Sequence, residues 1–422
     1  MRHFLFAMSL AASPPAMAQA TAPRATVEAV AHAIEEHYFD PAAAAKIATR
    51  LRADARAGRF DKLTPPQLAA RLTAGLGAID RHFAVHWRPD ADDAGSRPGE
   101  PFYGPEEQER RAGYGFRRVE ILPGNIAYID LRLFAAIDFG NAKWPATLAA
   151  GNALGLVSKA DALIVDLRRN NGGDPGMVGY LVSALIGPDR DVYNVFHARG
   201  QTQSERPPRP FTGEALQMPV YILTSRRTGS AAESFAYTLQ AAKRAIVIGQ
   251  PSAGGANPGD AVALKGGFSV FISNATPINP ITNANWEGVG VQPDTQVEDA
   301  DTLAIAQRRA LEDAMPRLPA AEKIEAARVL ETLRAPSGPA PDTIAALAGL
   351  YGTYRFIARA GTLYLIGATG TETPLGWLGA DRFYPAGDPT TRYTFLRGTN
   401  GRGSALTIEW IDGDRREASR SD

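Results

Sequence analysis

The stretch Pro219-Val-Tyr-Ile-Leu-Thr-Ser-Arg-Arg-Thr-Gly-Ser-Ala-Ala-Glu233 decides how the centre of this chain folds. Its first five residues are apolar and rich in β-branched side chains, which is typical of a short buried strand. From Ser230 to Ala242 the apolar residues recur at helical spacing. The stretch therefore predicts a strand that turns directly into a helix, with Ser230 at the start of the helix.

Ser230 has two interpretations at such a junction. The first backbone N–H groups of a helix are unpaired and its start carries a partial positive charge, so a serine there can act where negative charge develops. The alternative is an ordinary serine N-cap, which is the commoner use of serine at this position. The segment alone leaves both interpretations open.

Strands and helices alternate on both sides of this junction, from Gly113 to about Asp294. That alternation predicts an α/β domain with a mixed sheet. Two more helices, Asp301–Met315 and Ala320–Arg334, are expected to complete it. The other expected elements are strands Phe116–Ile121, Asn125–Leu131, Ala162–Leu167, Val192–Phe196, Ala245–Ile248 and Phe268–Ile272, with helices near Pro145–Val157 and at Met177–Ile186.

The N-terminal part has the pattern of an exported protein followed by a helical module. Residues 1–20 combine Arg2, an apolar stretch and a small-residue ending, which predicts a signal peptide cleaved after Ala18 or Ala20. Residues 21–87 are then expected to form helices, with a capping box that begins at Thr64. The module ends in a run of period two, His82–Trp87, with its two histidines on one face.

The C-terminal part changes character after a segment rich in proline and glycine. Residues 335–342 read as a linker, and residues 343–422 as a small antiparallel β-domain with a barrel-like arrangement. The predicted domains are therefore the signal peptide 1–20, the helical module 21–87, the α/β core 88–334, the linker 335–342 and the β-domain 343–422.

Composition narrows the class of protein. The 422 residues include 45 Lys and Arg against 45 Asp and Glu, so no charge surplus suggests a nucleic acid or an anionic membrane as partner. The absence of cysteine excludes disulfides, thiol catalysis and thiolate metal sites. No stretch after the signal peptide reaches the roughly 18 apolar residues of a membrane span. A peptide or a small, nearly neutral molecule is the expected substrate.

A nucleophilic serine needs a base, and the chain offers few histidines for that role. Of the six, His3 lies in the signal peptide and His32 and His37 in the first helix, which leaves His82, His86 and His197. His82 is the preferred candidate because it lies where a helix gives way to a strand. The alternatives are that His82 and His86 are half-buried strand residues, or that they bind a metal with Asp90, Asp92 and Asp93.

Two further segments supply candidates for the remaining roles. Gly172 and Gly173 follow a predicted buried strand, and glycine there allows backbone N–H groups to approach an anion closely. An oxyanion hole could combine either glycine N–H with that of Ala231, although a plain glycine turn or a phosphate-binding turn would look similar. Glu287 lies among glycines and could orient a histidine, as could Asp260 or Asp294.

Taken in order, four motifs resemble the C-terminal processing or tail-specific peptidase family, over roughly residues 25 to 310. The resemblance is to the branch that contains the tricorn protease core and the repeats of interphotoreceptor retinoid-binding protein. The motifs are Asp-x-His-Phe83, Val-Asp-Leu-Arg-x-Asn-x-Gly-Gly173, Thr-x-x-x-Thr-x-Ser-Ala-Ala-Glu233 and Trp-Glu-Gly-x-Gly-Val-x-Pro-Asp294.

The resemblance implies a ClpP/crotonase-type core and a serine peptidase that needs no metal or other cofactor. It implies Ser230 as nucleophile, His82 as general base and Glu287 as the acidic member of the relay. It also implies that the oxyanion is held by the backbone N–H groups of Gly172, Gly173 and Ala231.

The chain departs from the family pattern in three respects. The processing branch pairs its serine with a lysine on the following strand, but residues 250–256 contain none and Lys265 comes well after them. No Gly-Leu-Gly-type peptide-binding module is evident, and Arg81 stands where the related branch can carry a hydroxyl. We therefore expect an exported Ser-His-Glu peptidase, with an apolar-ligand carrier or an esterase or lactamase as the alternatives.

Overall fold

The computed structural model describes residues 22–89, 106–187, 189–298, 300–336, 338 and 341–421. The predicted signal peptide and Asp90, Asp92 and Asp93 lie outside the described residues. The chain divides into two compact units. The first unit comprises Met1–Phe102, Tyr193–Glu205 and Gly255–Gly288, and the second comprises Tyr103–Val192, Arg206–Gly254 and Val289–Asp422.

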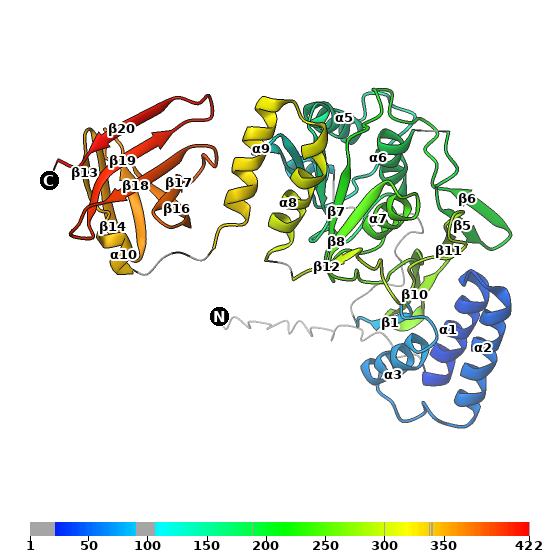
Figure 1. Ribbon diagram of the computed structural model, residues 1–422. Coiled ribbons are helices and arrows are strands. Elements are labelled where there is room, and N and C mark those ends of the chain that lie inside the picture. Colours follow the sequence, from blue (N-terminus) through cyan, green and yellow to red (C-terminus); the bar gives the residue numbers. More distant parts are fainter. Residues whose placement is uncertain are drawn as a thin grey trace, which may run out of the picture. The chain divides into compact units, whose positions relative to one another are not determined.

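The first unit begins with three helices, which lie in the predicted helical module 21–87. Asp40 accepts hydrogen bonds from the first N–H groups of α2, and the Gln67 side chain accepts the Thr64 N–H in the predicted capping box. The apolar residues Val27, Val30 and Ile34 of α1 are buried, whereas Ile79, which follows the end of α3, is 45% exposed. The helices are α1 (Pro23–His37), α2 (Pro41–Arg56) and α3 (Pro65–Gly77) (Figure 1).

Distant segments complete the first unit. Strand β1 (Ala84–Trp87) pairs antiparallel with β10 (Phe268–Ser273), which pairs with β9 (Gly259–Ala263). Phe83 and Val85 are buried beside β10 in the helical core, as their period-two spacing predicts. In the division expected from the sequence, β1 lies in the helical module 21–87 and β10 in the core 88–334. Since β1 pairs with β10, the two strands instead belong to the same compact unit. A second small sheet has the order β11 (Ala275–Ile278), β5 (Val195–Ala198) and β6 (Gln201–Ser204).

The second unit contains the predicted mixed sheet, in the strand order β12-β8-β7-β4-β3-β2. Only β2 pairs antiparallel within it, as the hairpin partner of β3. The other neighbours are parallel. Helices lie in the connections from β3 to β4, from β4 to β7 and from β7 to β8, whereas the connection from β8 to β12 contains strands β9, β10 and β11. The strands are β2 (Phe116–Leu122), β3 (Ile126–Leu131), β4 (Ala162–Asp166), β7 (Val220–Thr224), β8 (Ala245–Gly249) and β12 (Thr295–Gln296).

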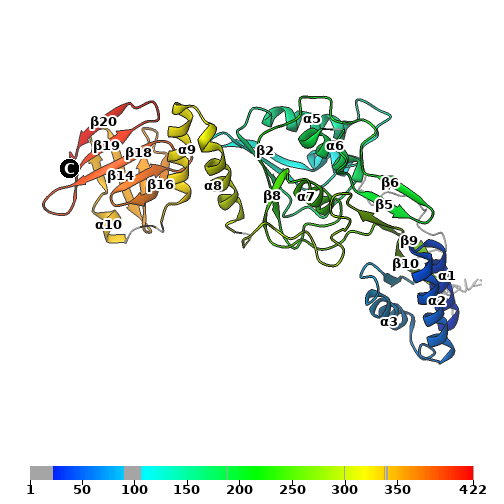
Figure 2. The same ribbon diagram turned by 45° about the vertical axis from the view of Figure 1, so that its right-hand side comes forward.

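Helices cover both faces of this sheet, which explains why its central strands are buried along their whole length and mostly apolar. One face packs against α8 (Thr302–Ala314) and α9 (Ala320–Leu333), and their small and aliphatic residues share a core with it. Figures 1 and 2 show α5 (Pro145–Val157), α6 (Pro175–Ile186) and α7 (Ala231–Ala241) on the other side. The remaining short helices are α4 (Glu106–Arg111) and the 3₁₀ turns Gly113–Gly115, Lys265–Gly267 and Met315–Arg317.

The C-terminal segment is the predicted antiparallel β-domain, preceded by α10 (Pro341–Ala345). Its eight strands pair in chain order, and hydrogen bonds between Leu350 and Ser421 and between Gly352 and Ser419 join the first strand to the last. The sheet thus closes into a barrel, whose interior holds aromatic rings in edge-to-face contact. The strands are β13 (Gly349–Tyr351), β14 (Tyr354–Arg359), β15 (Thr362–Ile366), β16 (Glu372–Gly379), β17 (Arg382–Pro385), β18 (Arg392–Arg397), β19 (Gly403–Glu409) and β20 (Arg415–Ser419).

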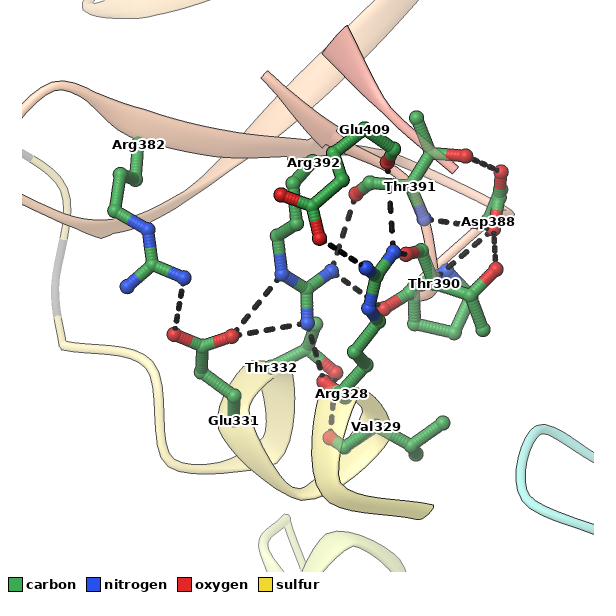
Figure 3. Close-up of polar contacts among 11 residues, drawn as sticks. Arg328, Val329, Glu331, Thr332, Arg382, Asp388, Thr390, Thr391, Arg392 and Glu409 are labelled. Carbon is green, nitrogen blue, oxygen red and sulfur yellow. Dashed lines mark hydrogen bonds and ion pairs between the residues drawn. The ribbon is translucent and has the colours of Figure 1, made fainter. Parts of the chain in front are cut away.

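Arginines attach this barrel to α9 (Figure 3). The buried guanidinium of Arg392 donates to Glu331 at 3.0 Å and to the Arg328 carbonyl at 2.7 Å. In the opposite direction, Arg328 donates to the Thr390 carbonyl and to the Glu409 carboxylate. A buried guanidinium needs such partners, so these hydrogen bonds hold the barrel against α9 in one arrangement.

No helix in the described part of the chain is long and apolar enough to cross a membrane.

Candidate active site

Ser230 lies on a strained turn between β7 and α7. Its backbone has φ 52° and ψ −122°, and the residue is exposed. N-cap residues normally have extended backbone, and positive φ is uncommon outside glycine. Ser230 is the N-cap of α7, as the alternative interpretation holds, and it forms a capping box with Glu233. Its positive φ distinguishes it from an ordinary N-cap. A strained strand-to-helix turn with an exposed hydroxyl is the geometry that presents a nucleophilic serine in α/β hydrolases.

Hydrogen bonds tie this turn to the loop that follows β4. Strands β4 and β7 are parallel neighbours, so their carboxyl ends lie at the same edge of the sheet. The hydroxyls of Thr228 and Ser225 donate to the carbonyls of Leu167 and Arg168 at 2.8 Å and 2.6 Å. The Gly229 N–H donates to the Asn170 carbonyl at 3.0 Å. The serine turn and the glycine loop therefore form one framework.

The two glycines of that loop must be glycine. Gly172 has φ 120°, and a Cβ on it would lie 2.7 Å from Ser230 Cβ. Gly173 has φ 136°, and a Cβ on it would lie 2.1 Å from the Phe134 carbonyl oxygen. A side chain at either position would clash, because the backbone passes directly beside Ser230 at Gly172 and beside Phe134 at Gly173.

The N–H groups of this framework differ in what they bind. The Gly172 N–H already donates to the Asn170 Oδ1 at 2.8 Å. Within the described ranges, no hydrogen-bond acceptor is found for the N–H groups of Gly173 and Ala231. Of the three donors named from the sequence, Gly173 and Ala231 are therefore the two available to an anion.

His82 lies between α3 and β1, where two carboxylates face its ring. Nδ1 is 3.0 Å from Asp80 Oδ1 and 3.5 Å from Glu287 Oε1. Asp80 Oδ1 also accepts the His82 backbone N–H at 2.9 Å, and the Asp80 side chain is only 3% exposed. With Nδ1–H facing carboxylates, Nε2 becomes the nitrogen that can accept a proton.

Glu287 is held in place by its other oxygen. Oε2 accepts the N–H groups of Ala256 and Asn257 at 2.8 Å and 3.1 Å, which leaves Oε1 toward His82. The two alternative acids bind elsewhere: Asp260 accepts from Asn274, and Asp294 accepts the Val247 N–H.

Asp80 is the site residue that sequence reasoning missed, although it is nearer to His82 Nδ1 than Glu287 is. Its signal was present in the sequence, since an aspartate two residues before a histidine can bind that residue's backbone N–H in a tight turn.

These contacts change the acidity of the groups involved. The hydrogen bond to Asp80 raises the pKa of His82 despite the opposing effect of burial, and the charge of Glu287 raises it further. Burial alone would raise the pKa of Asp80, but hydrogen bonds from the His82 side chain and backbone and from Ser273, together with the charge of His82, outweigh burial and lower it. The imidazolium form of His82 is thus favoured by its surroundings.

The two other candidate bases are His86 and His197. His86 and His197 are exposed on strands, and the aspartates of the alternative metal site lie outside the described residues. Among the residues described, one group, Asp80, His82 and Glu287, has three potential ligand atoms within 4.8 Å of one another. The histidine–carboxylate contacts already account for that closeness.

The candidate residues thus form two sets, each built within its own unit. Ser230, Gly172, Gly173 and Ala231 belong to the second unit, and His82 and Glu287, with Asp80, belong to the first.

Comparison with known proteins gives one match to a family model. The model of peptidase family S41 matches residues 125–297. This segment includes Ser230, both glycines and Glu287, whereas His82 precedes it. The match confirms the predicted family resemblance and the class of serine peptidase.

The fold is also similar to solved structures at low identity. A lipoprotein from Streptococcus agalactiae is 15% identical, with 72% of this chain and 99% of that chain covered and a TM-score of 0.48. The photosystem II D1 C-terminal processing protease is 16% identical, with 66% of this chain and 94% of that chain covered and a TM-score of 0.43. The tricorn protease is 13% identical, with 67% of this chain and 35% of that chain covered and a TM-score of 0.39.

We predict that the pKa of His82, measured by NMR titration of its ring, lies above the ordinary value of about 6.5. Asp80→Asn should lower this pKa because it removes the largest favourable interaction of the imidazolium, and Glu287→Gln should lower it less. The control is Asp260→Asn, which removes a carboxylate of the same unit that binds Asn274. An unchanged His82 pKa in Asp80→Asn would contradict the assignment.

Proposed function

We propose that Ser230 is the nucleophile and His82 the general base of a serine peptidase, in a chain whose residues 125–297 match the model of peptidase family S41. One observation carries the proposal: Ser230 is an exposed residue on a positive-φ turn, beside a glycine loop with an N–H group that has no acceptor among the described residues. Strained backbone that its surroundings hold in place clusters at active sites.

The proposed reaction is acyl transfer to the serine. Ser230 Oγ attacks the carbonyl carbon of the scissile peptide bond while His82 Nε2 takes the hydroxyl proton. The N–H groups of Gly173 and Ala231 stabilise the oxyanion. The C–N bond then breaks, and His82 gives the proton to the leaving amine. A water molecule, deprotonated by His82, next attacks the carbonyl carbon of the acyl-enzyme. The ester bond to Ser230 breaks, the acid is released, and His82 returns the proton to Ser230 Oγ.

Asp80 and Glu287 have a supporting part in this proposal. Both carboxylates face Nδ1, so they select the tautomer with Nε2 unprotonated and stabilise the imidazolium that forms during the reaction. The relay proposed from the sequence, Ser230–His82–Glu287, thereby gains Asp80 as a second acid. A lysine base is not part of the proposal, since residues 250–256 contain no lysine.

The proposed substrates are peptides or unfolded polypeptides, cleaved by a C-terminal processing or tail-specific type of peptidase. Support comes from the family match and from a composition without a charge surplus. No cofactor enters the proposed chemistry. An apolar-ligand carrier, an esterase and a lactamase remain as outcomes of the tests below.

Two variants test the catalytic pair. Ser230→Ala should abolish peptide hydrolysis and covalent labelling by a fluorophosphonate, because both need the serine oxygen. His82→Ala should lower kcat by about 10⁴-fold or more, as the loss of a triad base does. The matched control is His86→Ala, an exposed histidine on β1, which should keep wild-type kcat.

Equal labelling of Ser230→Ala would remove the nucleophile assignment, and near-normal kcat in His82→Ala would move the base elsewhere. Labelling without peptide turnover would favour an esterase or lactamase, and a wild-type protein that never labels would favour a carrier.

Export to the periplasm or the medium is the proposed localisation, on the pattern of residues 1–20. The protein recovered from that compartment should begin at Gln19 or Thr21, as determined by mass spectrometry of its N-terminal peptide. A mature protein that is found there with Met1 or Arg2 at its start would contradict cleavage by signal peptidase.

A further inference from the structure

A buried carboxylate lies directly behind the serine turn. Glu233, in the first turn of α7, is 0% exposed. Carboxylates are rarely buried so completely unless several donors bind them, because the charge loses its hydration. The donors around Glu233 therefore indicate what it holds in place.

One Glu233 oxygen binds the nucleophile's own backbone. Oε2 accepts the Ser230 N–H at 2.8 Å. That N–H is consequently directed inward and cannot serve an oxyanion, so the next N–H along the chain, that of Ala231, takes that place. The hydrogen bond also restrains the peptide that precedes Ser230 Cα, at the residue whose φ is positive.

The second Glu233 oxygen binds a different loop. Oε1 accepts the Ser252 hydroxyl and the Gly254 N–H, each at 2.5 Å. Ser252 Oγ in turn accepts the Val291 N–H at 2.6 Å. Capping of α7 would need only the bond to Ser230. The additional bonds fix the serine turn to the loop after β8 and to the segment around Val291.

We propose that Glu233 is a positioning residue for the nucleophile. Its carboxylate keeps Ser230 at positive φ and thereby fixes where the hydroxyl and the Ala231 N–H point. This inference rests on Ser230 being the nucleophile, as proposed above.

Glu233→Gln tests the inference with little change in size. In either orientation of the amide, its NH₂ group faces the N–H of Ser230 or that of Gly254, so one donor loses its acceptor. We expect kcat and the rate of fluorophosphonate labelling to fall by about 100-fold, the cost of a small misplacement of reacting groups. KM and the midpoint of the acid limb of the pH–rate profile should stay at wild-type values, because neither substrate contacts nor His82 is altered.

Two further variants separate positioning from general stability. Glu325→Gln weakens a carboxylate bond to the Gly124 N–H elsewhere in the second unit and should label at the wild-type rate. Ser252→Ala removes one partner of Glu233 and keeps the bond to Ser230, so it should slow labelling less than Glu233→Gln does. Circular dichroism and thermal unfolding measure the folded fraction, and each labelling rate is expressed per folded molecule.

A folded Glu233→Gln protein that labels at the wild-type rate would overturn the positioning role and leave Ser230 as nucleophile. If Glu233→Gln does not fold, Ser252→Ala decides: slowed labelling supports the role, and a wild-type rate overturns it. A wild-type protein that does not label at Ser230 overturns the proposed function itself, and this inference with it.

Discussion

The parallel pairing of β4 with β7 is the interaction on which the rest of the site depends. It aligns Leu163 with Val220 and Asp166 with Leu223, so the loops that follow the two strands start side by side. Hydroxyls of the serine turn then bind carbonyls of the glycine loop, and Glu233 braces the turn from within. A backbone held from both sides can retain a positive φ at Ser230 that an isolated turn would relax.

The histidine set has its own constraint, which is electrostatic. Asp80 and Glu287 both approach Nδ1 of one imidazole, which favours its protonated form and directs Nε2 away from them. Each acid is itself held, Asp80 by the backbone of His82 and Glu287 by two N–H groups after Gly255. A base arranged in this way gains proton affinity, and it needs a higher pH before it is free to act.

Much of this was accessible from the sequence, for physical reasons that differ between elements. Buried strands such as β4 and helices such as α5 have continuous or periodic apolar patterns, so their positions were predicted closely. Strands β6 and β9 were not predicted, since Gln201–Ser204 is entirely polar and exposed and β9 is half-exposed with small residues. The pairing of β1 with β10 joins residues far apart in sequence, which periodicity cannot reveal. For the same reason the pattern indicated Ser230 and His82 but not that Asp80 binds His82 or that Asn170 occupies the Gly172 N–H.

The central claim is that Ser230 becomes acylated by its substrate, and trapping that intermediate tests it most directly. A peptide ester or peptide is mixed with the enzyme, the reaction is quenched in acid within the first turnover, and the protein is digested for mass spectrometry. The account predicts that the peptide containing Ser230 carries the mass of the acyl group, and that Ser230→Ala carries none. An acyl group on another residue, or rapid hydrolysis with no covalent adduct at any quench time, would contradict it.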